Sequence, residues 1–455
     1  MSPDTPPPEG RWARLSRIVF EPVDVASLVV FRIAFGTLLT VEAVRYLAKG
    51  WVERKYIRPE IHFPFFGFEW LPHPGAWATE VFVALGVLGA CVTIGFCYRL
   101  AAALYFVGFT WMFLLEQAYY LNHLYLVCLL AFLAPFLPAH RAYALDARLT
   151  PGLRADRVSG WALFLLRAMF VQVYTFAGIA KLNPDWVRAQ PLLLWLEKRG
   201  DYPVVGPLLA HDATAWVMSY GGLAFDLLVG PALCWRRTRA PAMVAAFGFH
   251  GTNAVLFDIG IFPWLMMAST LLFLPASWPR SVGLLPPASG EAARLPEGRA
   301  RTAVAIALVT WFGVQTALPV RHWFIPGDVA WTEEGHYFSW RMKLRTKDGR
   351  ARFRVVDVDT GEERVVEPTR ELPKRIAEQL VTQPYMILQY AHHLAREASA
   401  RGRRVRVYAD VRARLNGRPP QRLIDPDVDL AAQPRSLAPA RWILPSTEPL
   451  PGWDW

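Results

Sequence analysis

The sequence predicts a polytopic α-helical membrane protein with about nine transmembrane helices and a C-terminal extramembrane α+β domain. Of its 455 residues, 53% are hydrophobic and 19 are tryptophan, a composition too apolar for an ordinary soluble protein. Apolar runs of spanning length recur up to about residue 320, and alternating patterns with turn signals follow. We therefore expect a helical membrane domain over residues 1–320 and an α+β domain over residues 321–455.

The membrane domain is expected to contain nine spans, because about 20 apolar residues in a helix cross the hydrocarbon core of a bilayer. An odd number of spans places the two termini on opposite sides. Arginines are more frequent in the segments that share the side of the N-terminus, so the positive-inside rule predicts a cytoplasmic N-terminus and an extracytoplasmic C-terminal domain. The expected helices cover 24–47, 76–97, 100–117, 120–138, 159–181, 214–235, 241–257, 260–278 and 302–319.

The C-terminal region alternates apolar and polar residues. The stretch "YFSWRMKLRTKDGRARFRVVDVDTGEERVVEP" contains two turn signals, at 347–349 and 359–361, which predict a three-stranded antiparallel meander. The stretch "ELPKRIAEQLVTQPYMILQYAHHLAREASA" predicts a helix that is bent or broken at Pro384. Further strands with an Asn-Gly turn are expected in "RRVRVYADVRARLNGRPPQRLIDP".

Charge and cysteine content exclude several classes of protein. The formal charge of +11 accompanies no nucleic-acid motif, so we expect membrane topology and an acidic partner to explain it, without nucleic acid. The four cysteines fall in or beside apolar runs, and their spacing fits neither a disulfide framework nor a zinc site. We expect no bound metal. Motifs of serine hydrolases, zinc proteases and nucleotide-binding proteins are also absent from the sequence.

Polar residues inside apolar runs are functional candidates, because burying them in a membrane is costly. The candidates are Arg32, the pair Asn122 and His123, and the pair His250 and Asn253, which share one helical face. Each also has a structural interpretation. An arginine can pair with a carboxylate or a backbone carbonyl, and a lone membrane histidine is more often a hydrogen-bonded packing residue than a catalyst.

Lys181 closes the apolar run "YTFAGIAKLNPDW". A lysine at the edge of a membrane helix is commonly an anchor, with its ammonium group reaching water. A lysine held in an apolar pocket loses its proton more readily and can serve as a base. The sequence allows both interpretations of Lys181.

Several motifs, in order along the chain, resemble one family. "YTFAGIAKLNPDW", "FHGTNAVLFDIGIF", "EGHYFSWRMKL" and "RLIDPDVDL" are similar to motifs of the vitamin K-dependent gamma-glutamyl carboxylases. "FRIAFGTLLTVEAVRY" and "YLNHLYL" resemble the membrane region of that family, which is of the HTTM type and is shared by a wider group of bacterial proteins. The resemblance covers about residues 20–445 and implies a bacterial homologue, located in the inner membrane.

The resemblance implies an enzyme that oxidises reduced vitamin K with O2 to the epoxide and adds CO2 to the γ-carbon of a protein glutamate. In a bacterial host the quinol would be menaquinol. By position, Lys181 matches the catalytic base and His123 a histidine that assists carboxylation, while Tyr390 matches a tyrosine near the active site. Asn122, His250, Asn253, Trp340 and Arg32 are expected to bind the quinone or the substrate. Expected partners are a glutamate-containing protein or peptide and membrane lipid.

The sequence departs from the family at one position and leaves two alternatives open. The paired lysines of the family are here Ala180 and Lys181, so only the second lysine is present. One alternative is a non-catalytic quinone- or lipid-binding membrane protein on the same scaffold. The other is a membrane acyltransferase that uses His123 or His250.

Overall fold

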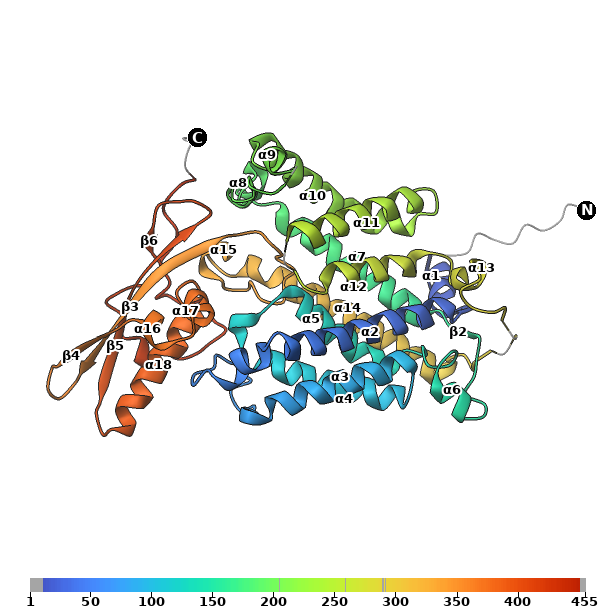
Figure 1. Cartoon of the computed structure of the whole chain (residues 1–455), viewed down its shortest axis with the longest axis horizontal. Coiled ribbons are helices and arrows are strands. Elements are labelled where there is room, and N and C mark those ends of the chain that lie inside the picture. Colours follow the sequence, from blue (N-terminus) through green and yellow to red (C-terminus); the bar gives the residue numbers. More distant parts are fainter. Residues whose placement is uncertain (1–10, 204, 258, 289, 291, 451–455) are drawn as a thin grey trace, which may run out of the picture.

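The computed structural model describes residues 11–450, apart from 204, 258, 289 and 291. A bundle of helices forms one end of an elongated molecule, and a sheet with its own helices forms the other (Figure 1). Nine helices of the bundle lie where the sequence predicts them. They are α2 (Ala26–Ala48), α3 (Ala78–Ile94), α4 (Tyr98–Leu114), α5 (Asn122–Leu133), α7 (Trp161–Lys181), α10 (Asp212–Cys234), α11 (Arg239–Leu256), α12 (Phe262–Thr270) and α14 (Gly298–Val320).

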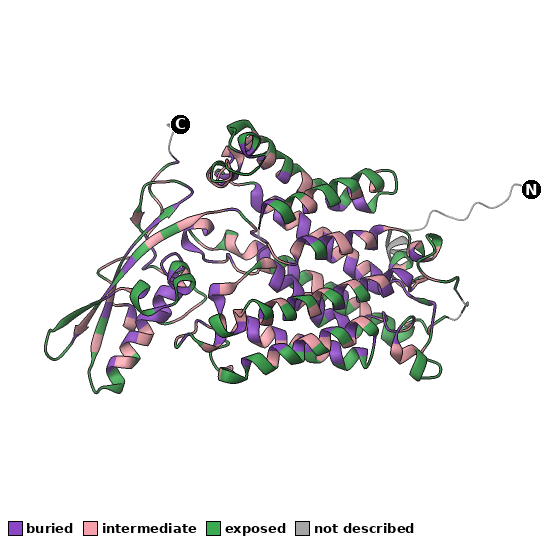
Figure 2. Ribbon diagram, in the orientation of Figure 1, coloured by how far each residue is buried: buried purple, intermediate pink, exposed green. Residues whose placement is uncertain are grey.

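Within the described residues, five helical segments are long and apolar enough to cross a membrane, namely Ala26–Ala48, Gly75–Ile94, Trp161–Lys181, Asp212–Cys234 and Gly298–Phe324. Three shorter apolar helical segments accompany them, at Tyr98–Leu114, Asn122–Phe136 and Phe262–Phe273. Many residues of the bundle helices are exposed (Figure 2), and the structure buries only 17% of the apolar window in Gly298–Phe324. Such a surface is stable in lipid. The helical membrane class is therefore confirmed, whereas the count of nine spans is not.

Small residues let the longest helices approach one another closely, as is typical of membrane helix pairs. A Cβ atom on Gly36 of α2 would lie 2.5 Å from the Thr93 nitrogen of α3. A Cβ atom on Gly178 of α7 would lie 2.7 Å from the Leu227 side chain of α10. The second contact brings the C-terminal end of α7 against the middle of α10.

Shorter elements connect the bundle helices. Strands β1 (Pro22–Asp24) and β2 (Arg157–Ser159) pair antiparallel, with Pro22 opposite Ser159. The short helices are α1 (Arg11–Phe20), α6 (Leu145–Leu149), α8 (Leu192–Glu197), α9 (Gly206–Leu209), α13 (Trp278–Ser281) and α15 (Val329–Thr332).

The C-terminal part is built on a four-stranded antiparallel sheet in the order β4-β3-β5-β6. Its strands are β3 (Lys347–Asp357), β4 (Glu363–Val366), β5 (Val405–Leu415) and β6 (Gln421–Arg422). Alternate residues of β5 are buried, and α18 (Pro384–Ala400) packs against the sheet on its buried side. The helices α16 (Pro368–Glu371) and α17 (Lys374–Leu380) complete this α+β layer, as Figure 1 shows.

One predicted turn is wrong and three other predictions are confirmed. Residues 347–349 do not form a turn but begin β3, with Gly349 opposite Ala413 of β5. Glycine is required there because a Cβ atom would lie 2.6 Å from the Arg412 carbonyl oxygen. The turn at 359–361 and the Asn416-Gly417 turn are present, with left-handed φ angles at Gly361, Asn416 and Gly417. The predicted helix breaks before Pro384, which is the first residue of α18.

The C-terminal part is tied to the end of α7 by a buried carboxylate. Asp185 lies in the turn that follows Lys181, and both of its oxygens accept hydrogen bonds from Arg418 at 2.7 Å. Asn416 Nδ2 donates a third bond to Asp185, also 2.7 Å long. Bidentate arginine–carboxylate pairs fix orientation as well as distance. The Pro-Asp-Trp turn after Lys181 therefore docks the sheet onto the helical bundle.

Candidate active site

A cavity of about 390 Å³ lies where the ends of several bundle helices meet the segment 336–345. It is lined by the start of α5, the end of α7, and parts of α10, α11, α12 and α17. Five of the residues predicted to act in the site line this cavity. These are Asn122, His123, Lys181, His250 and Asn253.

Lys181 is the last residue of α7, and only 6% of its surface is exposed. Its Nζ atom lies 2.5 Å from Asp226 Oδ2 of α10 and 5.2 Å from the centre of the Trp186 ring. Trp186 is fixed in turn, since its Nε1 donates to the Ser219 carbonyl at 2.9 Å. The amine therefore faces the cavity under an aromatic side chain, which is not the geometry of an anchor that reaches water.

The turn after Lys181 is held by its own side chains. Asn183 Oδ1 accepts hydrogen bonds from the backbone nitrogens of Asp185 and Trp186 at 3.1 and 3.0 Å. Asn183 Nδ2 donates to the Ala180 carbonyl at 2.8 Å. Such Asx turns stop a helix and reverse the chain. The sequence Asn-Pro-Asp-Trp therefore sets both where α7 ends and where the indole ring lies.

Asp226 is a residue of this site that our sequence reasoning missed. It occupies the middle of α10, and its side chain is buried. The signal was present, because a carboxylate inside an apolar run is as costly as the histidines and the arginine that we selected. The sequence does not reveal its partner, since the contact with Lys181 depends on how α7 and α10 pack around Gly178.

Replacing Asp226 by alanine is expected to destabilise the protein by roughly 3–5 kcal/mol, because removing one partner leaves the other charge buried and unpaired. The double variant Lys181→Met with Asp226→Leu removes both charges and is expected to recover most of that loss. Thermal unfolding of the wild type and both variants in one detergent measures the two effects. A single variant as stable as the wild type would show that Asp226 does not compensate a charge on Lys181.

The two histidines approach the cavity from different helices. His250 of α11 shares a hydrogen bond with the Tyr174 hydroxyl group of α7, with 2.7 Å between Nε2 and the oxygen. His123 is the second residue of α5, and its ring centre lies 6.1 Å from that of Phe262, which lies 5.9 Å from that of His250. Both imidazoles are buried. Phe262 therefore lies between two imidazoles that are far apart in the sequence.

The surroundings of His123 are cationic. Gly260 has a φ angle of +61°, and a Cβ atom there would lie 3.5 Å from His123 Nε2 and 3.3 Å from Arg45 Nη1. Arg45 is paired with Glu42 at 2.7 Å. Among the described residues, His123 has no side-chain hydrogen bond that the structure records, in contrast to His250. The imidazole of His123 is therefore open to a ligand in the cavity.

Three predicted site residues do not line the cavity. Arg32 donates to the carbonyl oxygens of residues 139, 142 and 143, as the structural interpretation of a membrane arginine expects. Trp340 packs on Tyr125, with 5.1 Å between ring centres. Tyr390 lies in the core of the C-terminal part and donates to Glu371 at 2.5 Å. All three make structural contacts outside the cavity wall, and their predicted contact with the quinone or the substrate stays a prediction.

Residues 333–345, which contain the motif "EGHYFSWRMKL", form one wall of the cavity and have a strained backbone. We call them the outer segment. Glu333, Phe338, Trp340 and Lys343 all have positive φ angles between 53° and 63°. A left-handed backbone costs roughly 1–3 kcal/mol per residue other than glycine, and such strain is concentrated at functional sites. The surrounding packing must hold this segment in place.

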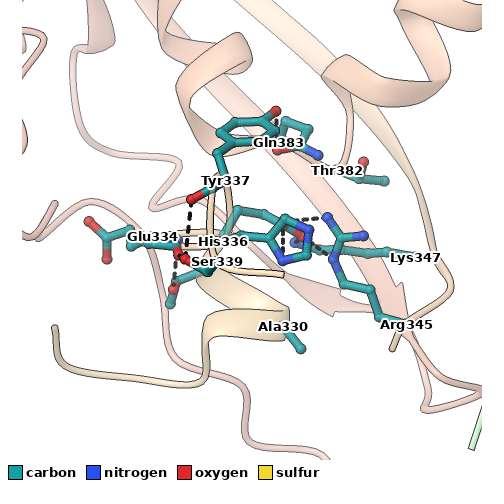
Figure 3. A network of polar contacts seen from close by, with 12 residues as sticks. Ala330, Glu334, His336, Tyr337, Ser339, Arg345, Lys347, Thr382 and Gln383 are labelled. Atoms are coloured by element: carbon teal, nitrogen blue, oxygen red, sulfur yellow. Dashed lines mark hydrogen bonds and ion pairs between the residues drawn. The ribbon is translucent and has the colours of Figure 1, made fainter. Parts of the chain in front are cut away.

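A buried ion cluster supports that segment (Figure 3). Arg345 pairs with Glu333 through two nitrogens, one of them at 2.7 Å, and Lys347 Nζ lies 3.5 Å from the same carboxylate. Burial lowers the pKa of Lys347 to about 8. Burial, reinforced by the neighbouring arginines, lowers the pKa of His336 well below its usual value, so this imidazole stays neutral at neutral pH.

No group of three or more metal-ligating side chains occurs among the described residues. The four cysteines, which all lie in that part of the chain, are free thiols. The polar groups of the described residues that line the cavity are imidazoles, amides, tyrosine hydroxyl groups, indoles, one carboxylate and several cations. Such groups can transfer protons and bind anions.

Comparison with known families agrees with this architecture. Residues 20–278 match the model of the HTTM domain, which places the chain among membrane proteins of that class. Residues 300–449 match the model described as the lumenal domain of vitamin K-dependent gamma-carboxylase. The chain belongs to the vitamin K-dependent gamma-carboxylase family. No solved structure was found to match it.

Proposed function

We propose that this protein is a vitamin K-dependent gamma-carboxylase. It couples the oxidation of a reduced naphthoquinone by O2 to the addition of CO2 to the γ-carbon of glutamate in a protein or peptide. The main observation behind the proposal is that Lys181 of α7 and His123 of α5 line one cavity, which residues 336–345 also line. Family membership supports the substrate class and the need for vitamin K.

The cavity suits a flat aromatic ring with two hydroxyl groups. Its wall combines the apolar side chains of Phe249, Phe262 and Met266 with two polar pairs. The pairs are Lys181 with Asp226 and Tyr174 with His250. These residues would hold reduced vitamin K. When bound, reduced vitamin K supplies, through its reaction with O2, the strong base that removes the γ-proton of glutamate.

Lys181 is proposed to accept the proton of the quinol. For this, its Nζ atom must first be neutral, and Asp226 Oδ2, 2.5 Å away, is the nearest acceptor for the proton it carries. Exclusion of water raises the free energy of the ion pair toward that of a neutral amine beside a neutral acid, so that transfer of this proton becomes accessible. Trp186 covers the amine on one side and limits the access of water. Asp226 therefore accepts the Lys181 proton reversibly.

His123 is proposed to serve the carboxylation half of the reaction. Its uncommitted imidazole and the nearby Arg45 can orient CO2 or stabilise the charge that develops as the new C–C bond forms. Asn122, beside it, accepts a hydrogen bond from Tyr120 at 3.0 Å. Asn122, His250 and Asn253 are proposed to contact the quinone or the substrate.

The proposal is tested by incubating the purified protein with a reduced naphthoquinone, O2, labelled bicarbonate and a glutamate-rich peptide. We expect label in the peptide and quinone epoxide in comparable amounts. Heat-inactivated protein and a peptide with glutamine in place of glutamate are the controls. Absence of both products, with folded protein, would contradict the proposal.

A second candidate is a non-catalytic quinone- or lipid-binding protein, and the ion pair favours it. A lysine that stays protonated against Asp226 would only join α7 to α10. Such a protein would bind the naphthoquinone and yield neither epoxide nor labelled peptide. Measuring quinone binding beside the two products separates the candidates.

We also propose the arrangement in the membrane: nine crossings, with residues 321–455 as a separate extracytoplasmic domain of an inner-membrane protein in a bacterium. The observations that support it are the nine helices in the bundle and the match to a domain described as lumenal. Menaquinol would then be the natural quinol.

Reporter fusions test this topology. A reporter after residue 150 is expected on the cytoplasmic side and one at the C-terminus on the opposite side. Two reporters are used at each position, one active only in the cytoplasm and one active only outside it. Each reporter therefore checks the result of the other. The same side for both positions would exclude an odd number of crossings between them.

A further inference from the structure

Arg341 is a buried arginine that pairs with no other residue in the part of the chain that the structure describes. Only 7% of its surface is exposed, and among the described residues it makes no hydrogen bond or ion pair that the structure records. Its Nε atom is buried and unsatisfied. Burial lowers the pKa of Arg341 to about 10. A guanidinium with five donors is costly to bury in this state, so binding of an anion would stabilise it.

Among the described residues, no carboxylate pairs with Arg341. The acids that act on Arg341 through space are Asp328 and Glu333. Asp328 already accepts a hydrogen bond from the Ala330 nitrogen at 2.8 Å, and Glu333 is held by Arg345. Rearrangement of either would break a contact that shapes the strained outer segment.

Arg341 also differs from three other cations that line the cavity. Lys181 has Asp226, and Arg345 has Glu333. Lys343 lies over the Trp195 and Phe257 rings, at 5.4 and 5.6 Å from their centres. Among the described residues that line the cavity, Asp226 alone carries a carboxylate. The wall therefore carries an excess of positive charge, and at Arg341 this charge is both buried and uncompensated.

Arg341 lies at the boundary between two cavities. It lines the central cavity together with Lys181, and it lines a second cavity of about 480 Å³ on the other side of the α7 terminus, with Ala180 and Asn183. An anion bound to Arg341 from the central cavity would be next to the proposed reaction site. A ligand that needs an anionic group at that point is the glutamate side chain.

We propose that Arg341 binds the γ-carboxylate of the substrate glutamate, through paired hydrogen bonds from its guanidinium. The inference rests on the proposed carboxylase function and adds a residue to it. Arginine and carboxylate match in bidentate geometry, and the pair is strongest where water is excluded.

The chemistry of the reaction gives this contact a catalytic role. When the γ-proton leaves to the base generated by quinol oxidation, the C–H electron pair stays on the γ-carbon and spreads into the adjacent carboxylate. That carboxylate then carries a second negative charge, until the electron pair forms the new C–C bond with CO2. A guanidinium paired with this carboxylate stabilises the doubly charged state more than it stabilises the singly charged carboxylate of the bound substrate.

The test is binding of two peptides to the full-length protein in lipid nanodiscs without quinol, one with glutamate and one with glutamine at the same position. Wild-type protein is expected to prefer the glutamate peptide. Arg341→Met is expected to lower its affinity on the order of 30-fold and to erase the preference. Arg341→Lys is expected to restore only part of it, because an ammonium group cannot pair in the same planar geometry.

Arg350→Met is the matched control, because it removes the same charge from an exposed position on β3. It is expected to leave the preference unchanged. Arg341→Met should remain as stable as the wild type, since it removes an unpaired buried charge. A wild-type preference for glutamate in the Arg341→Met protein would overturn the inference. A second result would also overturn the inference. If Arg341→Met loses bound acidic phospholipid while its peptide binding is unchanged, Arg341 binds a lipid headgroup in the second cavity.

The same proteins separate this inference from the proposed function. If the wild type prefers glutamate through Arg341 but forms no carboxylated product with quinol and O2, the proposed function fails while Arg341 remains the carboxylate receptor. If the wild type carboxylates the peptide and Arg341→Met does so with unchanged affinity and rate, only the role of Arg341 fails.

Discussion

Replacing Lys181 by alanine is expected to abolish quinol epoxidation and glutamate carboxylation together. Both products depend on the first deprotonation, and a positioned general base contributes roughly 10²–10⁴-fold to such a step. The two activities should therefore fall in parallel by at least this factor. Assays of epoxide and of labelled peptide on the same protein sample measure both losses.

The arginine variant at the same position separates the base from a structural cation. Lys181→Arg can keep the pair with Asp226, so the protein should fold and be inserted normally. It should nevertheless remain inactive, because a guanidinium stays protonated and cannot accept the proton of the quinol. Near wild-type turnover in this variant would return Lys181 to the role of an ion-pair partner between α7 and α10.

Replacing His123 by alanine is expected to uncouple the two half-reactions. The imidazole lies near Arg45 and not in the Lys181–Asp226 pair, so quinol deprotonation does not need it. We expect epoxide formation to persist while carboxylation falls roughly 10²-fold, the loss typical of one charge-stabilising group. The measured quantity is the ratio of labelled peptide to epoxide.

His392→Ala is a suitable control for this variant, because His392 lies outside the cavity and bonds to the Gln433 carbonyl at 2.8 Å. It should leave the ratio of the two products unchanged. Equal loss of both products in His123→Ala would assign His123 to the structure of the cavity instead of to carboxylation.

The helices of the bundle could be predicted because hydropathy alone defines them. All nine predicted ranges contain a helix, since a lipid-facing helix must be apolar over most of its length. The turn predicted at 347–349 failed for a different reason. Gly349 is needed for the close approach of β3 to the Arg412 carbonyl, and a cross-strand contact of this kind leaves the same sequence signal as a turn.

The site could be predicted only in part. Lys181 and His123 stand out because each is a polar residue in an apolar run next to a recognisable motif. Asp226 has the same signal, but its importance depends on a helix contact that no local pattern encodes. Arg341 lies in a polar stretch where an arginine is ordinary, and only its burial without a partner distinguishes it.

Tyr390 and Trp340 show what a resemblance leaves open. Both match the family by position, and such a match says nothing of which way a side chain points. Tyr390 packs edge-on against Phe353 in the core under the sheet, with 5.0 Å between ring centres. Trp340, at a position with positive φ, turns toward Tyr125 and away from the cavity.

Chemical rescue of Lys181→Ala addresses the role of the amine most directly. Small primary amines of different pKa are added to the alanine variant, and epoxide formation is followed against pH. If the amine is the base, some epoxidation and carboxylation should return together, and each amine should become more effective as the pH approaches its own pKa. Failure of every amine, in a folded variant that still binds the naphthoquinone, would contradict the assignment of Lys181 as the base.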